Sequence, residues 1–230
     1  MAAKLDTTTE VFQADFDRIA LLSSEVWDHS GEYAAYLLQH VPENCREALE
    51  IGCGTGAFTR LMAQRSQRVT AVDLSPQMIR IARARSEQFS NIDFEVGDVM
   101  KMELPARRFD CIVAMATLHH LPFAEVVARM KAALKSGGVL LVLDLFAPEG
   151  LVDAMANIAA MPVSVGKRLI RTGRLKPPRA VRQAWADHGR HDSYLTVNQV
   201  RQICAGALPG ARIRKHLLWR YSIVWKKTND

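Results

Sequence analysis

Apolar and polar positions in residues 46–146 follow a repeated pattern of strand and then helix. Short apolar runs predict strands at 48–52, 68–74, 92–98, 109–116 and 139–146. Apolar positions that recur every three or four residues predict helices at 55–66, 75–89 and 123–136. Strands that alternate with helices of this length form right-handed βαβ units, so this region is expected to build a parallel sheet.

Two of these helices carry signals at their ends. The helix expected at 75–89 starts with Ser75, which can cap its first turn, and with Pro76, which suits the first helical position. This start places Asp73 at the carboxyl end of the preceding strand. The helix expected at 123–136 is followed by Gly137 and Gly138, which predict its end there.

The C-terminal residues predict a helix at 196–208 and then two strands. Thr196 is a good N-cap for the helix, and the apolar runs at 211–219 and 221–227 follow it closely. Because the two runs are joined at Arg220, an antiparallel hairpin is the natural pairing. The sheet is therefore expected to end in a reversed strand.

The segments that flank this pattern predict helical additions. Residues 10–40 show helical periodicity, and residues 148–194 combine helical patterns at 151–160 and 163–173 with four prolines. We therefore divide the chain into an N-terminal helical cap, a core, an inserted helical lid that contacts the substrate, and a helix and hairpin that complete the sheet. These parts span residues 1–40, 41–147, 148–194 and 195–230.

The composition is that of an ordinary globular protein, with 49% hydrophobic and 23% charged residues. There is no apolar run long enough to span a membrane, and the first residues lack the apolar region of a secretory signal, so we expect a cytoplasmic protein. The cysteines are spaced without a CxxC pair, which predicts reduced thiols and no metal site. They are Cys45, Cys53, Cys111 and Cys204.

The charge is distributed unevenly along the chain. Residues 1–150 hold 15 Lys and Arg against 20 Asp and Glu, whereas residues 151–230 hold 15 against 4. The most basic segment, 165–182, is compatible with peripheral contact to a membrane or with RNA, although such runs are most often solvated faces. It lacks the interleaved aromatic residues of a stacking platform, which makes nucleic acid the less favoured partner.

The turn after the first strand contains three glycines spaced by two, at Gly52, Gly54 and Gly56. A turn without side chains lets a ligand approach the backbone closely, as it does in dinucleotide-binding folds. Taken alone, this spacing also fits NAD. Glu50 favours a cationic ligand, because a carboxylate beside the turn opposes a pyrophosphate and suits the sulfonium and ammonium groups of S-adenosylmethionine.

At this point the chain resembles the class I S-adenosylmethionine-dependent methyltransferases. Five of their motifs occur in family order: LEIGCGTGAF (49–58), VTAVDLS (69–75), VGDV (96–99), FDCIVAMATLHHLP (109–122) and LKSGGVLLVLDL (134–145). The resemblance is close over about residues 46–146. It implies an α/β fold with a Rossmann-like, mostly parallel seven-stranded sheet of order 3-2-1-4-5-7-6, an antiparallel last strand, and helices on both faces.

The resemblance also implies a set of residues that bind the methyl donor. Asp73 accepts hydrogen bonds from both ribose hydroxyls, and Asp98 accepts one from the adenine amino group. Leu74 and Met78 pack on the adenine, while Val99 offers its backbone N–H to the ring. Gly52, Gly54 and Gly56 lie against the donor with Glu50 nearby, and Ala114 and Met115 border its methionyl part. Cys53 completes the cofactor-binding set.

The acceptor of the methyl group is less well defined by the sequence. His119 and His120 lie after the fourth strand, where either can act as a general base at neutral pH, although a packing role is the more common one for such a pair. The fourth motif lacks the Asn/Asp-Pro-Pro-Tyr/Phe sequence of enzymes that methylate exocyclic amino groups of nucleic acids. Aromatic residues of the flanking segments are candidate substrate contacts: Trp27, His29, Tyr33, Trp185 and Tyr194.

The sequence thus predicts a monomeric or homodimeric methyltransferase of small molecules, with S-adenosylmethionine as cofactor and S-adenosylhomocysteine as product. Oxygen or nitrogen is the favoured acceptor atom, followed by carbon. An enzyme directed at RNA, lipids or quinones, an NAD(P)-dependent oxidoreductase, and a non-catalytic protein that binds S-adenosylmethionine are the alternatives.

Overall fold

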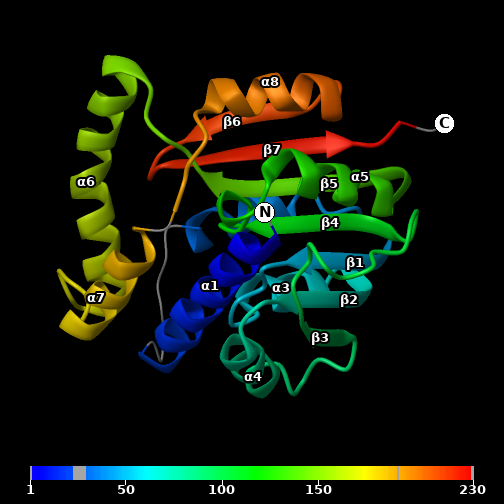
Figure 1. Ribbon diagram of the computed structural model, residues 1–230, viewed down its shortest axis with the longest axis horizontal. Helices are drawn as coiled ribbons and strands as arrows, with labels where there is room; N and C mark the ends of the chain where they lie inside the picture. The colour runs from blue at the N-terminus through cyan, green and yellow to red at the C-terminus, as the bar shows by residue number, and fades with distance from the viewer. Residues whose placement is uncertain (1, 23–29, 191, 229–230) are drawn as a thin grey trace.

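The computed structural model describes residues 2–22, 30–190 and 192–228, which form one seven-stranded sheet with helices around it (Figure 1). The strand order is β3-β2-β1-β4-β5-β7-β6, so the predicted fold class is confirmed. The strands are β1 (Cys45–Ile51), β2 (Ser66–Asp73), β3 (Ile92–Val96), β4 (Phe109–Met115), β5 (Leu134–Leu145), β6 (Arg212–His216) and β7 (Arg220–Lys226).

Strands β1 to β5 pair in parallel, as the alternating pattern predicts. β7 is antiparallel to both β5 and β6. His216 at the end of β6 pairs with Arg220 at the start of β7, so only three residues connect the two strands. Because a parallel crossover needs a much longer connection, this short turn forces the reversal. The predicted C-terminal hairpin is confirmed, and Arg220 lies inside β7 rather than in the turn.

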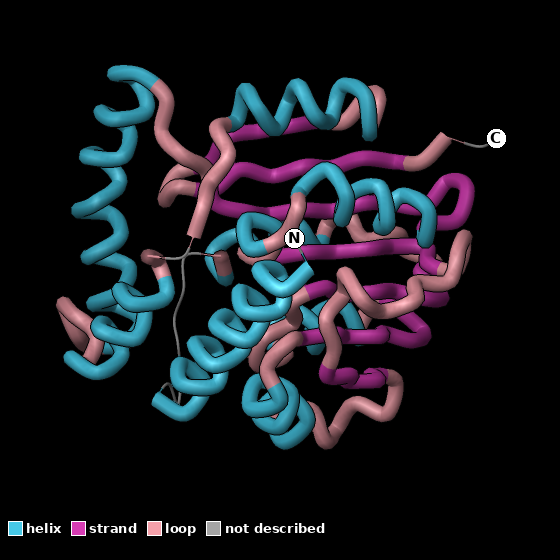
Figure 2. Tube along the Cα trace, in the orientation of Figure 1, coloured by secondary structure: helices cyan, strands magenta, loops and turns pink. Residues whose placement is uncertain are grey.

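The helices cover both faces of the sheet (Figure 2). They are α1 (Ala2–Leu22), α2 (Ala34–Leu38), α3 (Ala57–Ala63), α4 (Pro76–Ala84), α5 (Phe123–Ala133), α6 (Gly150–Thr172), α7 (Arg179–His188) and α8 (Val197–Ala207), with 3-10 turns η1 (Gly31–Tyr33) and η2 (Leu118–His120). Leu37 and Met62 belong to the core on the face of α2 and α3. Met130 and Val200 belong to the core on the opposite face, under α5 and α8.

The start of α4 agrees with the sequence signal. The Ser75 hydroxyl accepts the backbone N–H of Met78 at 3.0 Å, and Pro76 occupies the first turn, which together satisfy or remove N–H groups that lack helical partners. The helix ends at Ala84, earlier than the predicted 89. Its last turn tightens there, because Ser86 donates its N–H to the carbonyl of Arg83.

The predicted end of the next helix at Gly137 and Gly138 is wrong. α5 ends at Ala133, and Leu134 already pairs with Phe109 as part of β5. Gly138 lies where the strand bends, because a Cβ atom there would be 2.9 Å from the carbonyl oxygen of Lys135. Gly138 therefore allows a close backbone contact within the strand, and it does not cap the helix.

The two short helices predicted on either side of Pro162 are also a wrong prediction, since α6 runs through the proline as one helix. A proline inside a helix removes one backbone hydrogen bond. Pro162 is exposed, so water can satisfy the carbonyl that loses its partner. Among the described residues there is no helix long and apolar enough to cross a membrane.

The N-terminal helix α1 is fastened to the core through α4. The Asp17 carboxylate accepts hydrogen bonds from the Ser75 hydroxyl and, at 3.1 Å, from the backbone N–H of Gln77. A carboxylate at the positive end of a helix is favourable. Ile19 of α1 is buried against Met78 of α4, so polar and apolar contacts both hold α1 over the ends of the strands.

Candidate active site

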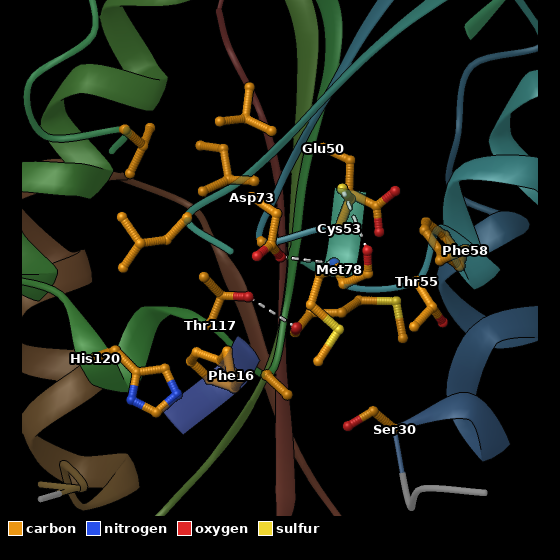
Figure 3. A pocket seen from close by; sticks show the side chains of 18 of the residues that line it. Phe16, Ser30, Glu50, Cys53, Thr55, Phe58, Asp73, Met78, Thr117 and His120 are labelled. Atoms are coloured by element: carbon orange, nitrogen blue, oxygen red, sulfur yellow. Dashed lines mark hydrogen bonds between the residues drawn. The ribbon is translucent and has the colours of Figure 1, made fainter. Parts of the chain in front are cut away.

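A cavity of about 790 Å³ lies at the carboxyl ends of β1, β2 and β4, where open α/β sheets bind their ligands (Figure 3). Core loops supply Gly54, Asp73 and Thr117 to its wall. α1 supplies Phe16 and α7 supplies Trp185, so segments far apart in the sequence close the other side. Ligand cavities of roughly 300 to 1,000 Å³ are typical, and this one has room for a nucleoside and a second small molecule.

The glycines of the turn after β1 have different physical roles. A Cβ atom at Gly52 would lie 2.1 Å from Oγ1 of Thr117, so the absence of a side chain here leaves room for the loop after β4. A Cβ atom at Gly54 would meet no protein atom within 4 Å, which leaves the backbone open to the cavity. Gly56 faces Phe94 and Ala82 and therefore packs against the protein. Only Gly54 provides the bare ligand surface that the sequence suggests for all three.

Asp73 organises the loops around it. One carboxylate oxygen accepts the N–H of Gly54 at 2.8 Å and the other accepts the N–H of Ser75 at 2.9 Å. Burial raises the pKa of Asp73, against the lowering effect of these two N–H groups. Each oxygen keeps a further lone pair, so the carboxylate can still accept two hydroxyl groups from the cavity.

Glu50 is buried at the end of β1 and accepts the Thr59 hydroxyl at 2.5 Å. Burial raises the pKa of Glu50 to about 8, with the hydrogen bond from Thr59 opposing the rise and the charge of Asp73 adding to it. A cation in contact with this buried carboxyl group would lower its pKa and favour its ionised form. The site therefore fits a positively charged ligand near Glu50 and an open backbone at Gly54.

The two histidines after β4 have different surroundings. His119 Nδ1 lies 2.6 Å from the buried carboxylate of Asp144, which also accepts the backbone N–H of His119. His119 borders a smaller pocket with Tyr194, away from the main cavity. His120 lines the main cavity, and its Nδ1 lies 3.1 Å from Asp192 Oδ1, outside the alignment of a good hydrogen bond.

His120 belongs to a buried network that joins three parts of the chain. His188 of α7 lies between Asp192, at 3.6 Å, and Asp15 of α1, at 3.4 Å. Burial lowers the pKa of His120, and the contact with Asp192 opposes this shift. Burial alone would raise the pKa of Asp192, but the contacts with His120 and Tyr194 lower it to about 2. The network thus pairs a neutral imidazole with an ionised carboxylate.

Among the described residues, His119, His120 and Asp192 are also close enough together to hold a metal ion, with one ligand atom from each within 4.8 Å of the others. Asp144 and Tyr194 already contact His119 and Asp192. These contacts already occupy His119 Nδ1 and one oxygen of Asp192 within the protein, so we describe the cluster as a polar network.

Comparison with known proteins decides between the ligands that this geometry allows. Residues 48–138 match a family model described as a methyltransferase domain. An uncharacterized methyltransferase of Mycobacterium tuberculosis is 29% identical over 209 residues, which is 87% of this chain and 96% of that protein. Together with the fold, these similarities support a class I S-adenosylmethionine-dependent methyltransferase. The alternative of an NAD(P)-dependent oxidoreductase is thereby set aside.

Two further relatives of the methyltransferase differ in their acceptors. A ubiquinone biosynthesis O-methyltransferase of Xanthomonas campestris is 30% identical over 148 residues, which is 58% of this chain and 62% of that protein. The structure of the N-methyltransferase NodS from Bradyrhizobium japonicum, in complex with S-adenosylhomocysteine, has a TM-score of 0.63 at 19% identity. The match covers 96% of this chain and 98% of the NodS chain, and the two proteins share the fold.

The residues assigned to the donor mostly surround the methyltransferase cavity. Ala114 is fully buried in β4, and the chain turns at Ala116, whose φ of 51° brings it into the cavity wall instead. Gly56 packs against the protein, as described above. Ten of the twelve assigned residues line the cavity: Glu50, Gly52, Cys53, Gly54, Asp73, Leu74, Met78, Asp98, Val99 and Met115.

The candidate substrate residues are spread more widely. Trp185 lines the cavity. The Tyr33 hydroxyl donates to the carbonyl of Leu217, and Tyr194 donates to Asp192 at 2.6 Å, so both hydroxyls are used within the protein. Trp27 and His29 lie outside the described residues.

The helical periodicity of residues 10–40 predicts a segment that packs over the carboxyl edge of the sheet, and α1 does line the cavity there. Phe12, Phe16 and Ile19 contribute from this helix, and Ser30 follows shortly after, although the sequence did not single them out as site residues. Asp192 was missed, because its contact with His120 joins residues far apart in the chain.

Proposed function

We propose that the methyltransferase transfers a methyl group to an oxygen or nitrogen atom of a small, largely apolar acceptor, with His120 as general base. The observation that carries this proposal is the position of His120 in the cavity wall beside the buried Asp192 carboxylate. Methyl transfer from a sulfonium is an in-line displacement, and S-adenosylmethionine supplies the activated carbon when bound. The protein has to orient the acceptor, remove its proton and exclude water.

The donor side of this proposal uses residues that surround Gly54. Asp73 would accept the ribose hydroxyls, Leu74 and Met78 would pack on the adenine, and Asp98 with the Val99 N–H would contact its polar edge. Glu50 would lie near the positively charged methionyl end. The open backbone at Gly54 and the raised pKa of Glu50 support this orientation, since both fit a cationic nucleoside.

The acceptor side depends on the state of His120. Burial favours the neutral imidazole, and a proton on Nδ1, which lies 3.1 Å from Asp192 Oδ1, would leave the lone pair on Nε2. As the acceptor atom forms its bond to the methyl carbon and the carbon–sulfur bond breaks, the proton of the acceptor moves to His120. Asp192 then stabilises the imidazolium. The apolar side chains of Phe12, Phe16 and Trp185 favour an aromatic or aliphatic acceptor.

The proposal is tested with His120→Gln and a panel of phenols, carboxylates and amines, using isotopically labelled donor. Loss of a general base lowers kcat by roughly 10² to 10⁴-fold, while the affinity for S-adenosylhomocysteine stays close to that of the wild type. Activity should be unaffected by a metal chelator. Full activity of His120→Gln, or turnover only with carbon acceptors, would overturn the role of His120.

A further inference from the structure

Helix α6 differs from an ordinary surface helix in which of its side chains are buried and which are exposed. Among the side chains of α6 that the structure describes, the buried ones are small or polar, namely Asp153, Ala160 and Ser164. On this inner side Asp153 forms an ion pair with Lys215, with 2.7 Å between Asp153 Oδ1 and Lys215 Nζ. A surface helix normally turns its large apolar residues toward the protein. Here the protein side is satisfied by a carboxylate and small residues, so the large apolar side chains are left outside.

Six exposed apolar residues of α6 form one continuous stripe, whereas Val163 and Ile170 are exposed on another side of the helix. Leu151, Met155, Ile158, Met161, Val165 and Leu169 are between 44% and 83% exposed. Their spacing of three or four residues places them on one side of the helix, opposite the buried residues. With a rise of 1.5 Å per residue, the stripe extends for about 27 Å. Figure 1 shows α6 at the left edge of the molecule, with the sheet on its right.

A cationic segment continues from the end of this stripe. Residues 154–186 contain seven Lys and Arg and no Asp or Glu. Lys167 and Arg171 reach inward to Glu32 near the cavity. Past the C-terminal end of α6 the cations are exposed, and they are Arg174, Lys176, Arg179 and Arg182.

The apolar stripe and the exposed cations together indicate which kind of partner fits this surface. A nucleic acid would use the cations and leave the apolar stripe in water. A second copy of this chain would use the stripe but would bring another set of cations with it. A bilayer that contains anionic lipids uses both, because its headgroups attract Lys and Arg while its acyl region accepts the apolar side chains. Because α6 is not apolar enough to cross a membrane, it would lie in the plane of the interface.

We infer that α6, together with the cationic segment after it, docks the methyltransferase on the surface of membranes that contain anionic lipids. Arg171 and Trp185 line the cavity, so docking through this side holds the cavity opening near the lipid surface. The inference does not depend on the acceptor or on the role of His120.

The experiment is flotation of the full-length protein with phosphatidylcholine vesicles, with and without phosphatidylglycerol. The protein should float with the anionic vesicles and remain largely unbound with the neutral ones, and added salt should weaken the binding. Ile158→Glu, in the middle of the stripe, should weaken partitioning by roughly ten-fold or more. Lys176→Ala and Arg179→Ala should each weaken it roughly five-fold.

Ala156→Glu is the matched control, because it adds the same charge to an exposed position on another side of α6. It should float like the wild type, and all variants should keep their affinity for S-adenosylhomocysteine, which shows that they are folded. Equal loss with Ala156→Glu and Ile158→Glu would overturn the inference. Failure of the wild type to float with anionic vesicles would also overturn it. This holds even if the protein self-associates through α6 or binds single-stranded RNA.

Discussion

At the scale of single residues, Asp73 and Gly54 act as one unit. The carboxylate holds the Gly54 N–H in place, and the glycine leaves the neighbouring space open to a ligand. The same carboxylate also fixes the start of α4 through Ser75. A residue that receives two backbone N–H groups before any ligand arrives is preorganised, so little of its conformational freedom is lost on binding.

The first prediction concerns the two oxygens of Asp73. Asp73→Ala removes two charge-assisted acceptors and should weaken binding of S-adenosylhomocysteine by about 2–4 kcal/mol, whereas Asp73→Asn keeps one acceptor and should cost roughly half as much. Isothermal titration calorimetry measures both. Asp93→Asn is the control, since Asp93 is half-exposed in β3 and paired with Arg68. Unchanged affinity in Asp73→Ala would mean that the ribose binds elsewhere.

The second prediction concerns the proton on Glu50. With a pKa of about 8, this carboxyl group is largely protonated at neutral pH, and a nearby sulfonium favours its ionised form. Binding of S-adenosylmethionine should therefore release a proton, and its affinity should rise by up to about ten-fold per pH unit below pH 8. Titrations in buffers of different ionisation enthalpy measure the proton. Glu50→Gln should abolish the release; release from that variant would exclude Glu50 as its source.

Glu50 also affects the stability of the protein without ligand. Because its pKa in the folded state is above the usual value, its favourable contribution is complete at acidic pH and is lost as the pH rises toward and through 8. Glu50→Gln should therefore raise Tm relative to the wild type at pH 8 and have a smaller effect at pH 5. The opposite ordering would contradict the buried, protonated state.

At the scale of elements, the network around His120 joins η2, α1 and α7. His120 contacts Phe12 and Phe16 of α1, with ring centroids 4.9 and 5.4 Å apart, and faces His119, His188 and Asp192. Helices α7 and α1 therefore meet at a group that can gain a proton.

This arrangement predicts a pH-dependent stability. The pKa of His120 is lowered on folding, so its contribution is complete above pH 6.5 and is lost as the pH falls through the lower value in the folded state. Because Glu50 contributes in the opposite sense over this pH range, the comparison is between variants: as the pH falls from 7 to 5, the Tm of His120→Gln should rise relative to that of the wild type. His40, whose pKa is also lowered, supplies the control as His40→Gln, which should leave the His120 contribution intact. An identical pH dependence of Tm in the wild type and in His120→Gln would argue against the network.

At the scale of the whole molecule, the sequence predicts what is local or repeated. The order of strands follows from the alternation of patterns, and the polar residues at strand ends meet because parallel strands share one edge. Contacts between distant segments could not be predicted in this way. Asp17 reaches Ser75 and Arg220 reaches Ser30, and no local pattern connects either pair. Local signals also fail where tertiary context outweighs them, as at Pro162 and Gly138.

The central claim is that the cavity at Gly54 and Asp73 binds the donor with its sulfur directed toward His120. The most direct measurement is a crystal structure of the methyltransferase with S-adenosylhomocysteine. The account predicts both ribose hydroxyls within hydrogen-bond distance of Asp73, adenine between Met78 and Val99, and the sulfur on the side of His120. Binding outside this cavity, or with the ribose away from Asp73, would contradict it.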